Sequence, residues 1–497
     1  FVDIEDLKGF RHIDSKLQGH PNMNYVSGVD MSTGSLGQGI SCAVGMAIAN
    51  KVDENDHRIY CLLGDGECEE GEVWEAAMAA SHYKLDNLCA ILDYNHLQID
   101  GNIDDVISPE PFKSKFEAFG WRVIEANGHD FNSLRTAFNF AKQTVDKPTI
   151  IIAHTIKGKG LHEAEVDKEH YHWIVPGELD KKPVAENAIR KESYESITAD
   201  YILDRASKDS SIIAISPATP GVSGFTPEFR KKLGKNYVDV GIAEEHAVAF
   251  ASGLAKGGAK PMLAVMSSFI QRTYDQLSQD LALNNTPATL LIFWGGITGM
   301  DATHLSKYDI PLICNIPNIV YLAPVNKEEY ISMMDWANSQ SEHSVVIRVP
   351  FTQVISTGEK DTTDYSKINK YQVVESGSEV AILGLGNFFH LGVKVKDALK
   401  ANLGISATLI NPHFISGVDE ELMESLKANH KLVITLEDGA IEGGFGEKIA
   451  SYFGNSDMKV LNFGARKEFT DRVPLEELYQ RYHLTPELIV DDIKNCL

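Results

Sequence analysis

The sequence predicts an α/β protein with three doubly wound domains and mostly parallel sheets. Short runs rich in Ile, Val and Leu alternate with helical patterns, which is typical of parallel strands covered by helices on both faces. The length of 497 residues fits roughly three domains of about 150 residues each. Polar stretches near 176–196 and 358–370 interrupt the pattern. We therefore expect domains at 1–195, 196–365 and 366–497.

The apolar runs are the predicted strands of each domain. The first domain has runs at 59–63, 88–92 and 149–153, with a helix at 72–83 after the first of them. The runs of the second domain lie at 212–215, 237–240, 262–266, 290–293, 319–322 and 345–349. Those of the third lie at 380–383, 407–410, 432–436 and 460–463. The pattern of residues 2–7 is typical of the start of a helix. Because residue 1 is Phe and not Met, we expect the chain to lack the start of its first domain.

Composition and charge argue against several classes of function. A formal net charge of -24 disfavours a surface for nucleic acid or anionic membrane, although an acid excess also serves solubility. The six cysteines form no Cys-x-x-Cys pair, and no apolar run approaches the ~18 residues that span a bilayer. We expect a cytoplasmic enzyme that acts on small molecules and binds neither nucleic acid nor membrane.

The sharpest motif lies at the ends of the first two predicted strands. Gly64-Asp65-Gly66 follows the first strand, and Asn95 follows the second. Because parallel strands end at the same edge of a sheet, the carboxylate and the amide oxygen should meet there. Such hard oxygen ligands suit Mg²⁺ or Ca²⁺ holding a diphosphate, which the glycines let approach the backbone. A plain strand-to-helix turn is the alternative for the glycine motif alone.

This two-part motif resembles that of the thiamine-diphosphate enzymes of the transketolase family. The resemblance implies that Gly64, Asp65, Gly66 and Asn95 hold cofactor and metal, with the Leu97 carbonyl as a further metal ligand. Segments 19–21 and 33–39 resemble those lining the thiazolium side in that family, and 157–160 with 171–172 resembles its substrate-contacting segment. By that match Leu36 contacts cofactor, and His20 and His172 face substrate.

The histidines have a plainer interpretation where no motif surrounds them. A single His among 17 is more often a surface group or a buried group with satisfied partners. We keep that interpretation for His96, His162 and His170.

The second predicted domain more closely resembles 1-deoxy-D-xylulose-5-phosphate synthase, a relative of transketolase. The segment 239–246 matches its pattern, and the resemblance implies that Glu244 contacts the aminopyrimidine of the cofactor and promotes loss of the thiazolium C2 proton. In 267–276, Phe269 would stack on the pyrimidine and Arg272 would meet a sugar phosphate. Without the match, they would be a core residue and a helix-face charge.

The next segment departs from both families. Both have Gly-x-Asp-Gly-Pro-Thr-His where this chain has 299–304, one residue shorter between Asp301 and His304, which we expect to contact sugar hydroxyls or carbonyl. Trp294 and Phe351 stand where the synthase has arginines, whereas Arg348 matches an arginine that transketolase uses for phosphate. A pocket with these exchanges should handle a different acceptor.

The third predicted domain resembles the C-terminal domain of the synthase in two segments, 380–386 and 437–446. Its Gly-x-Gly could suggest dinucleotide binding. Because Phe389 replaces the third glycine of that fingerprint, we interpret the glycines as structural.

Three functions compete on this evidence. The leading hypothesis is a transferase that moves a two-carbon ketol unit from a ketose or ketose phosphate to an aldose, using thiamine diphosphate with Mg²⁺ or Ca²⁺. The second is the synthase-like decarboxylating condensation of pyruvate with an aldehyde phosphate, and the third is an inactive cofactor-binding subunit. The resemblance also implies a homodimer with active sites across the subunit interface.

Overall fold

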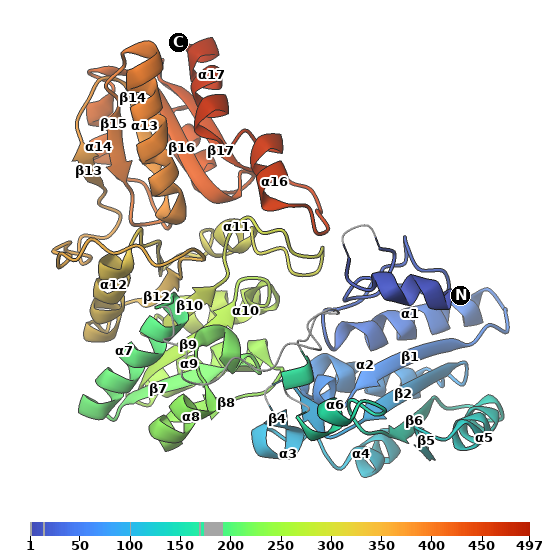
Figure 1. The fold of residues 1–497 in the computed structure, drawn as a ribbon. Coiled ribbons are helices and arrows are strands. Elements are labelled where there is room, and N and C mark those ends of the chain that lie inside the picture. The colour runs from blue at the N-terminus through green and yellow to red at the C-terminus, as the bar shows by residue number, and fades with distance from the viewer. Residues whose placement is uncertain (1, 13–14, 100, 168–169, 173–191) are drawn as a thin grey trace. The chain divides into compact units, whose positions relative to one another are not determined.

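The computed structural model describes residues 2–12, 15–99, 101–167, 170–172 and 192–497 (Figure 1). Most of the expected linker at 176–196 lies outside the described residues. The chain divides into two compact units, the first formed within 1–188 with 239–243 and the second within 189–238 with 244–497. The second and third predicted domains therefore belong to one unit.

The first unit is built on a four-stranded parallel sheet in the order β1-β2-β6-β5. Its strands, with the short β3–β4 hairpin, are β1 (Ile59–Gly64), β2 (Leu88–Tyr94), β3 (Leu97–Gln98), β4 (Gly101–Asn102), β5 (Arg122–Asn127) and β6 (Thr149–His154). The helices are η1 (Ile4–Gly9), α1 (Gln38–Val52), η2 (Gly66–Glu69), α2 (Gly71–His82), α3 (Ile103–Val106), α4 (Phe112–Ala118), α5 (Phe131–Lys142), α6 (His162–Val166) and η3 (His170–His172).

Burial explains which strands of this sheet the sequence revealed. The central strands β2 and β6 are largely buried, so their apolar runs are nearly continuous. The strand β5 forms an edge and keeps polar residues along its length, and the apolar pattern missed it. The buried faces of α1 and α2 include several alanines, which let helices pack closely: Ala43, Ala47, Ala76, Ala77 and Ala80.

The second unit contains a six-stranded sheet in the order β11-β12-β10-β9-β7-β8. The strands are β7 (Ile212–Ser216), β8 (Tyr237–Asp239), β9 (Lys260–Met266), β10 (Thr289–Phe293), β11 (Ile319–Leu322) and β12 (Ser344–Arg348). The helices around it are α7 (Tyr194–Lys208), η4 (Pro220–Ser223), α8 (Pro227–Leu233), η5 (Gly234–Asn236), α9 (Glu244–Lys256), η6 (Ile270–Thr273), α10 (Tyr274–Gln276), η7 (Leu277–Leu283), α11 (Asp309–Ile313) and α12 (Lys327–Ser339).

The same unit carries a five-stranded sheet in the order β13-β15-β14-β16-β17, in which only β13 is antiparallel to its neighbour. Its strands are β13 (Gln372–Glu375), β14 (Glu379–Gly384), β15 (Thr408–Asn411), β16 (His430–Ala440) and β17 (Lys459–Ala465). The helices are η8 (Gly386–Phe388), α13 (Phe389–Leu403), α14 (Glu420–Leu426), α15 (Phe445–Phe453), α16 (Leu475–Arg481) and α17 (Pro486–Cys496), with α13 and α17 side by side (Figure 1).

A shared core joins these two sheets. Phe414, which follows β15, is 1% exposed and belongs to the same hydrophobic cluster as Phe293 of β10 and Ile347 of β12. The predicted α/β class with mostly parallel sheets is confirmed. Among the described residues, no helix has both the length and the apolar character needed to cross a membrane.

Candidate functional site

The Gly-Asp-Gly motif lies where the sequence predicted it, at the carboxyl end of β1. Gly64 is opposite Asp93 in the parallel pairing of β1 with β2, so the residues that follow both strands share one edge of the sheet. Gly66 has no room for a side chain, because an added Cβ would lie 2.9 Å from Cβ of Gln98. The motif therefore forms a close turn against β3.

Asp65 is the centre of this turn. Its side chain is almost fully buried, with the residue 1% exposed. Oδ1 accepts a hydrogen bond from Gly66 N at 2.8 Å, and Oδ2 accepts from Asn95 N at 2.9 Å and His96 N at 2.5 Å. Burial raises the pKa of the Asp65 carboxyl, although the three backbone hydrogen bonds act to lower it. A bound cation would offset the cost of keeping this carboxylate charged.

The turn after β2 wraps around that carboxylate. Asn95 Oδ1 accepts a hydrogen bond from Leu97 N at 3.0 Å, and Asn95 Nδ2 donates to Asp93 Oδ2 at 3.3 Å. His96 has a φ of 64°, a left-handed conformation that reverses the chain between Asn95 and Leu97. The donor set at this edge is rich in oxygen, which fits a hard divalent cation such as Mg²⁺ or Ca²⁺.

Glu67 is a residue of this site that the motif analysis missed. Its Oε2 accepts from Gly64 N at 3.0 Å, and its Oε1 accepts from Gly37 N at 2.8 Å. One carboxylate thus ties the start of α1 to the turn that holds Asp65. Leu36, the expected cofactor contact, immediately precedes Gly37 and is 38% exposed. The acidic run after Gly66 was the available signal, but nothing in it singled out Glu67.

The expected substrate histidines of the first unit lie in a loop and in a short 3-10 helix. His20 is half-buried in the loop before α1. His172 ends η3, and Lys157 Nζ donates a hydrogen bond to its Nδ1 at 2.6 Å. Desolvation, with the charges of Lys157 and Arg11, lowers the pKa of His172 to about 4. The imidazole of His172 is therefore neutral near neutral pH.

In the second unit, Glu244 begins α9 and is 5% exposed. Its Oε2 lies 3.6 Å from Nη1 of Arg272, which belongs to η6. The two residues assigned by resemblance to the aminopyrimidine and to phosphate thus form a part-buried ion pair. Glu245, the neighbouring acid in the first turn of α9, is half-buried.

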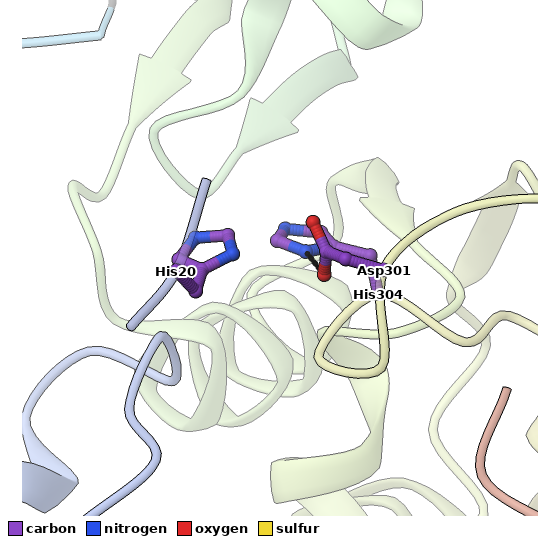
Figure 2. A group of neighbouring side chains, drawn as sticks. All are labelled: His20, Asp301 and His304. Atoms are coloured by element: carbon purple, nitrogen blue, oxygen red, sulfur yellow. Dashed lines mark hydrogen bonds and ion pairs between the residues drawn. The ribbon is translucent and has the colours of Figure 1, made fainter. Parts of the chain in front are cut away.

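Asp301 and His304 form a hydrogen-bonded pair in the loop after β10, as Figure 2 shows. His304 Nδ1 donates to Asp301 Oδ1 at 3.0 Å. The ring of His304 also packs edge-on against Phe269, with ring centroids 5.7 Å apart. The structure therefore brings together three residues of the second unit that resemblance assigned to cofactor or substrate. Figure 2 also labels His20, which belongs to the first unit.

Three family models match successive parts of this chain. Residues 1–181 match the thiamine diphosphate binding domain of transketolase, 192–354 its pyrimidine binding domain and 369–489 its C-terminal domain. The 1-deoxy-D-xylulose-5-phosphate synthase of Alkaliphilus oremlandii is 30% identical over 96% of this chain and 84% of its own length. That of Colwellia psychrerythraea is 31% identical over 94% and 81%.

The chain belongs to the transketolase family. Solved structures share its fold: a transketolase from Campylobacter jejuni, 21% identical, has a TM-score of 0.51 over 99% of this chain and 86% of that one. A transketolase from Pichia stipitis in complex with sedoheptulose 7-phosphate, 20% identical, also has a TM-score of 0.51, over 99% and 85%. As a member of the family, the protein is an enzyme that depends on thiamine diphosphate and a divalent metal ion.

In this member of the transketolase family, the two residues that the resemblance sets in place of synthase arginines form an aromatic pair. Trp294 follows β10 and Phe351 follows β12, and their ring centroids are 5.6 Å apart. Trp294 has a φ of 58°, which is costly for a bulky residue and persists only where its surroundings enforce it. Phe351 is 43% exposed.

Arg348, the residue matched to a phosphate-binding arginine of transketolase, has other partners in this structure. Its side chain is 4% exposed. Nε donates to Asp309 Oδ2 at 2.6 Å, Nη2 donates to Asp309 Oδ1 at 3.2 Å, and Nη1 donates to Asp438 Oδ1. Tyr321 Oη donates to the same Asp309 at 2.6 Å. The phosphate contact of Arg348 stays a prediction, and this geometry gives the guanidinium a structural role between β12 and β16.

Proposed function

We propose that the protein transfers a two-carbon ketol unit from a ketose or ketose phosphate to an aldose acceptor. The observation that carries this proposal is the aromatic pair Trp294 and Phe351 at the carboxyl ends of β10 and β12. An arginine binds phosphate through charge-assisted, often bidentate hydrogen bonds, which indole and phenyl rings cannot replace. The exchange therefore argues against the aldehyde phosphate that the synthase condenses with pyruvate. The transketolase-like motifs of the first unit support the same conclusion.

The residues of the first unit would hold the cofactor. Asp65 and Asn95, with the Leu97 carbonyl, would supply oxygen ligands to the metal, and the glycines of the turn would let a diphosphate approach the backbone. When bound, thiamine diphosphate supplies the nucleophilic carbon that attacks the donor ketone. Leu36 immediately precedes Gly37, whose N donates to Glu67, and this position next to the turn supports its role as a cofactor contact.

The residues of the second unit would move protons and orient substrate. Glu244 is buried at the start of a helix, where it can hold a proton against a ring nitrogen of the cofactor, and Phe269 offers a flat apolar face. Because Asp301 accepts from Nδ1 of His304, Nε2 is the nitrogen left to exchange a proton with a sugar hydroxyl. Arg272 and Arg348 are the candidates for a donor phosphate, and His20 and His172 are the candidates from the first unit for contacting substrate.

The decarboxylating condensation is the second candidate. Identity of 30% with a 1-deoxy-D-xylulose-5-phosphate synthase across 96% of the chain favours it. Retention of Arg272 fits it as well, since the resemblance assigns that position to the sugar phosphate.

One experiment separates these functions. The full-length protein, with thiamine diphosphate and Mg²⁺, is incubated with pyruvate plus glyceraldehyde 3-phosphate, and separately with ketose phosphates and unphosphorylated ketoses. Carbon dioxide and released aldehyde are followed independently. We expect aldehyde from a ketose and no carbon dioxide from pyruvate. Carbon dioxide without any aldehyde would replace our proposal by the condensation, and neither product would indicate an inactive cofactor-binding subunit.

A further inference from the structure

The segment between β17 and α16, residues 466–474, is fastened to the loop that carries Asp301 and His304. Lys307 is 3% exposed, and its Nζ donates to the carbonyls of Arg466 at 3.0 Å and Glu468 at 2.9 Å. Tyr308 Oη donates to the same Glu468 carbonyl at 3.1 Å. The segment that follows the last strand, β17, thus contacts the loop after β10 directly.

Arg472 lies in this segment under tight backbone constraints. Its N donates to the carbonyl of Met300 at 3.0 Å. Its φ of 51° is left-handed, a conformation that non-glycine residues adopt at a cost and that is enriched at functional positions. On the other side of the contact, a Cβ added to Gly299 would lie 2.8 Å from the carbonyl oxygen of Val473. The two stretches of backbone therefore fix one another in place.

The side chain of Arg472 faces Asp301. Nη2 lies 3.8 Å from Asp301 Oδ2, and the side chains are 19% and 12% exposed. At this separation the pair is an ion pair without a direct hydrogen bond, and partial burial strengthens it relative to an exposed pair. The negative charge of Asp301 is thus countered by a cation that comes from beyond the pyrimidine-binding part of the chain.

The other oxygen of Asp301 organises its own loop. Oδ1 accepts hydrogen bonds from Thr303 N at 3.1 Å, from Thr303 Oγ1 at 2.6 Å and from His304 Nδ1 at 3.0 Å. Figure 2 draws the last of these three. The carboxylate therefore has one oxygen for His304 and one toward Arg472. A carboxylate that accepts from Nδ1 fixes the tautomer and the orientation of an imidazole, which leaves Nε2 as its working nitrogen.

We propose that Arg472 is a positioning residue of the active site: it orients Asp301, and through Asp301 it holds the His304 imidazole with Nε2 toward substrate. The kinetic part of this inference rests on the proposed function, because it requires His304 to meet substrate. The orientation of His304 does not depend on any reaction and can be measured by itself.

The competing explanation is that Arg472 only fastens the C-terminal segment to the loop. In that case its loss would lower stability without changing His304 or its coupling to Asp301. The two explanations therefore differ in three measurable quantities: the tautomer of His304, the division of an effect between kcat and KM, and the additivity of mutations at Arg472 and Asp301.

The test uses Arg472→Gln and Arg472→Lys in the full-length protein with thiamine diphosphate and Mg²⁺. Arg466→Gln is the matched control, since Arg466 is an exposed arginine of the same segment. Nitrogen-15 NMR of the histidine side chains, with His304→Gln to assign the signal, reports the tautomer. We expect Arg472→Gln to shift the His304 signals toward a tautomer mixture, Arg472→Lys to restore part of the shift, and the control to match wild type.

The kinetic arm measures ketose cleavage in the same variants and in Asp301→Asn. We expect Arg472→Gln to lower kcat about tenfold or more with a smaller change in KM, since misplacing a group that acts on substrate costs mainly turnover. In the Asp301→Asn background the Arg472→Gln change should have little further effect, because residues that act as a unit are not additive. The control should keep wild-type kinetics.

Several outcomes would overturn the proposal. Unchanged His304 signals in Arg472→Gln would do so, even if the protein cleaved no ketose at all. Multiplicative losses in the double variant would do so as well, as would a lower unfolding temperature with kcat and the tautomer unaltered. If wild type cleaves no ketose but the His304 signals shift as expected, the proposed function fails while the positioning role of Arg472 stands.

Discussion

At the residue scale, Asp65 is a buried carboxylate that accepts hydrogen bonds from three backbone N–H groups. A bound cation would stabilise the charged form of this carboxylate. Asp65→Asn keeps the shape and removes the charge, so we expect the affinity for thiamine diphosphate with Mg²⁺ to fall roughly a hundredfold or more, since loss of even an outer-shell partner of a metal costs about 10–100-fold. Titration calorimetry measures the affinity. Asp56→Ala, at an exposed acid just before β1, should bind as wild type does. Unchanged affinity in Asp65→Asn would remove Asp65 from the site.

The residues found and missed at this scale differ in whether a recognisable pattern in the sequence places their partners. Asp65 and Asn95 could be predicted, because a motif at the ends of two neighbouring parallel strands places both at one edge. Glu67 could not, since its second partner, Gly37, lies in the loop before α1 and not at the end of a neighbouring strand. Arg472 was missed for the same reason: its contact with Asp301 joins segments whose approach no local pattern encodes.

At the scale of elements, burial decided what could be read from sequence. Strands that are buried along nearly their whole length, such as β6 and β10, have continuous apolar runs. Their bounds were predicted to within a residue or two. The strand β13 is exposed at every position and pairs antiparallel at an edge, so it has no apolar signature. The predicted helix at 72–83 is α2, whereas the helix expected from residue 2 is the short 3-10 helix η1.

The junction of β16 with α15 holds a buried acid that should make stability depend on pH. Glu437 is 0% exposed and accepts hydrogen bonds from Phe445 N and Gly446 N. Burial raises the pKa of the Glu437 carboxyl to about 7, although the two backbone hydrogen bonds act to lower it. Between the unfolded pKa near 4.3 and this value, the native state binds the extra proton. The stabilising contribution is therefore full below that window and is lost as pH rises through it.

Glu437→Gln should remove this dependence. Relative to the variant, we expect wild type to lose unfolding free energy on the order of 3 kcal/mol between pH 4.5 and 7. Urea denaturation at several pH values measures the difference. Glu442→Gln, an exposed acid in the loop after β16, is the control and should follow wild type. Parallel pH profiles for wild type and Glu437→Gln would contradict the assignment.

At the scale of the whole molecule, we expect a homodimer in which each active site is completed by two chains. Asp65 belongs to the first unit and Glu244 to the second, and the transketolase resemblance assigns the two halves of a site to different subunits. If so, a mixed dimer of Asp65→Asn and Glu244→Gln chains contains one doubly altered site and one intact site. Co-refolding equal amounts should restore about a quarter of wild-type turnover, because half the dimers are mixed.

Light scattering on the same samples gives the mass of the assembly and shows whether it is a dimer. Each variant alone should be nearly inactive. A mixture that stays as inactive as its components, in a protein with the mass of a dimer, would place each site within one chain. A monomer with full turnover would contradict the dimer itself.

The Arg348 network also determines where this chain can be cut. A fragment that ended at the predicted boundary near 365 would keep Asp309 but lose Asp438, leaving a buried guanidinium with half of its counter-charge. Removing one partner of such a buried pair costs about 3–5 kcal/mol, a large share of the stability of a domain. We therefore do not expect a fragment cut between the family models, which end at 354 and begin again at 369, to be stable by itself. We therefore expect the pyrimidine-binding and C-terminal portions, which form one compact unit, to unfold together.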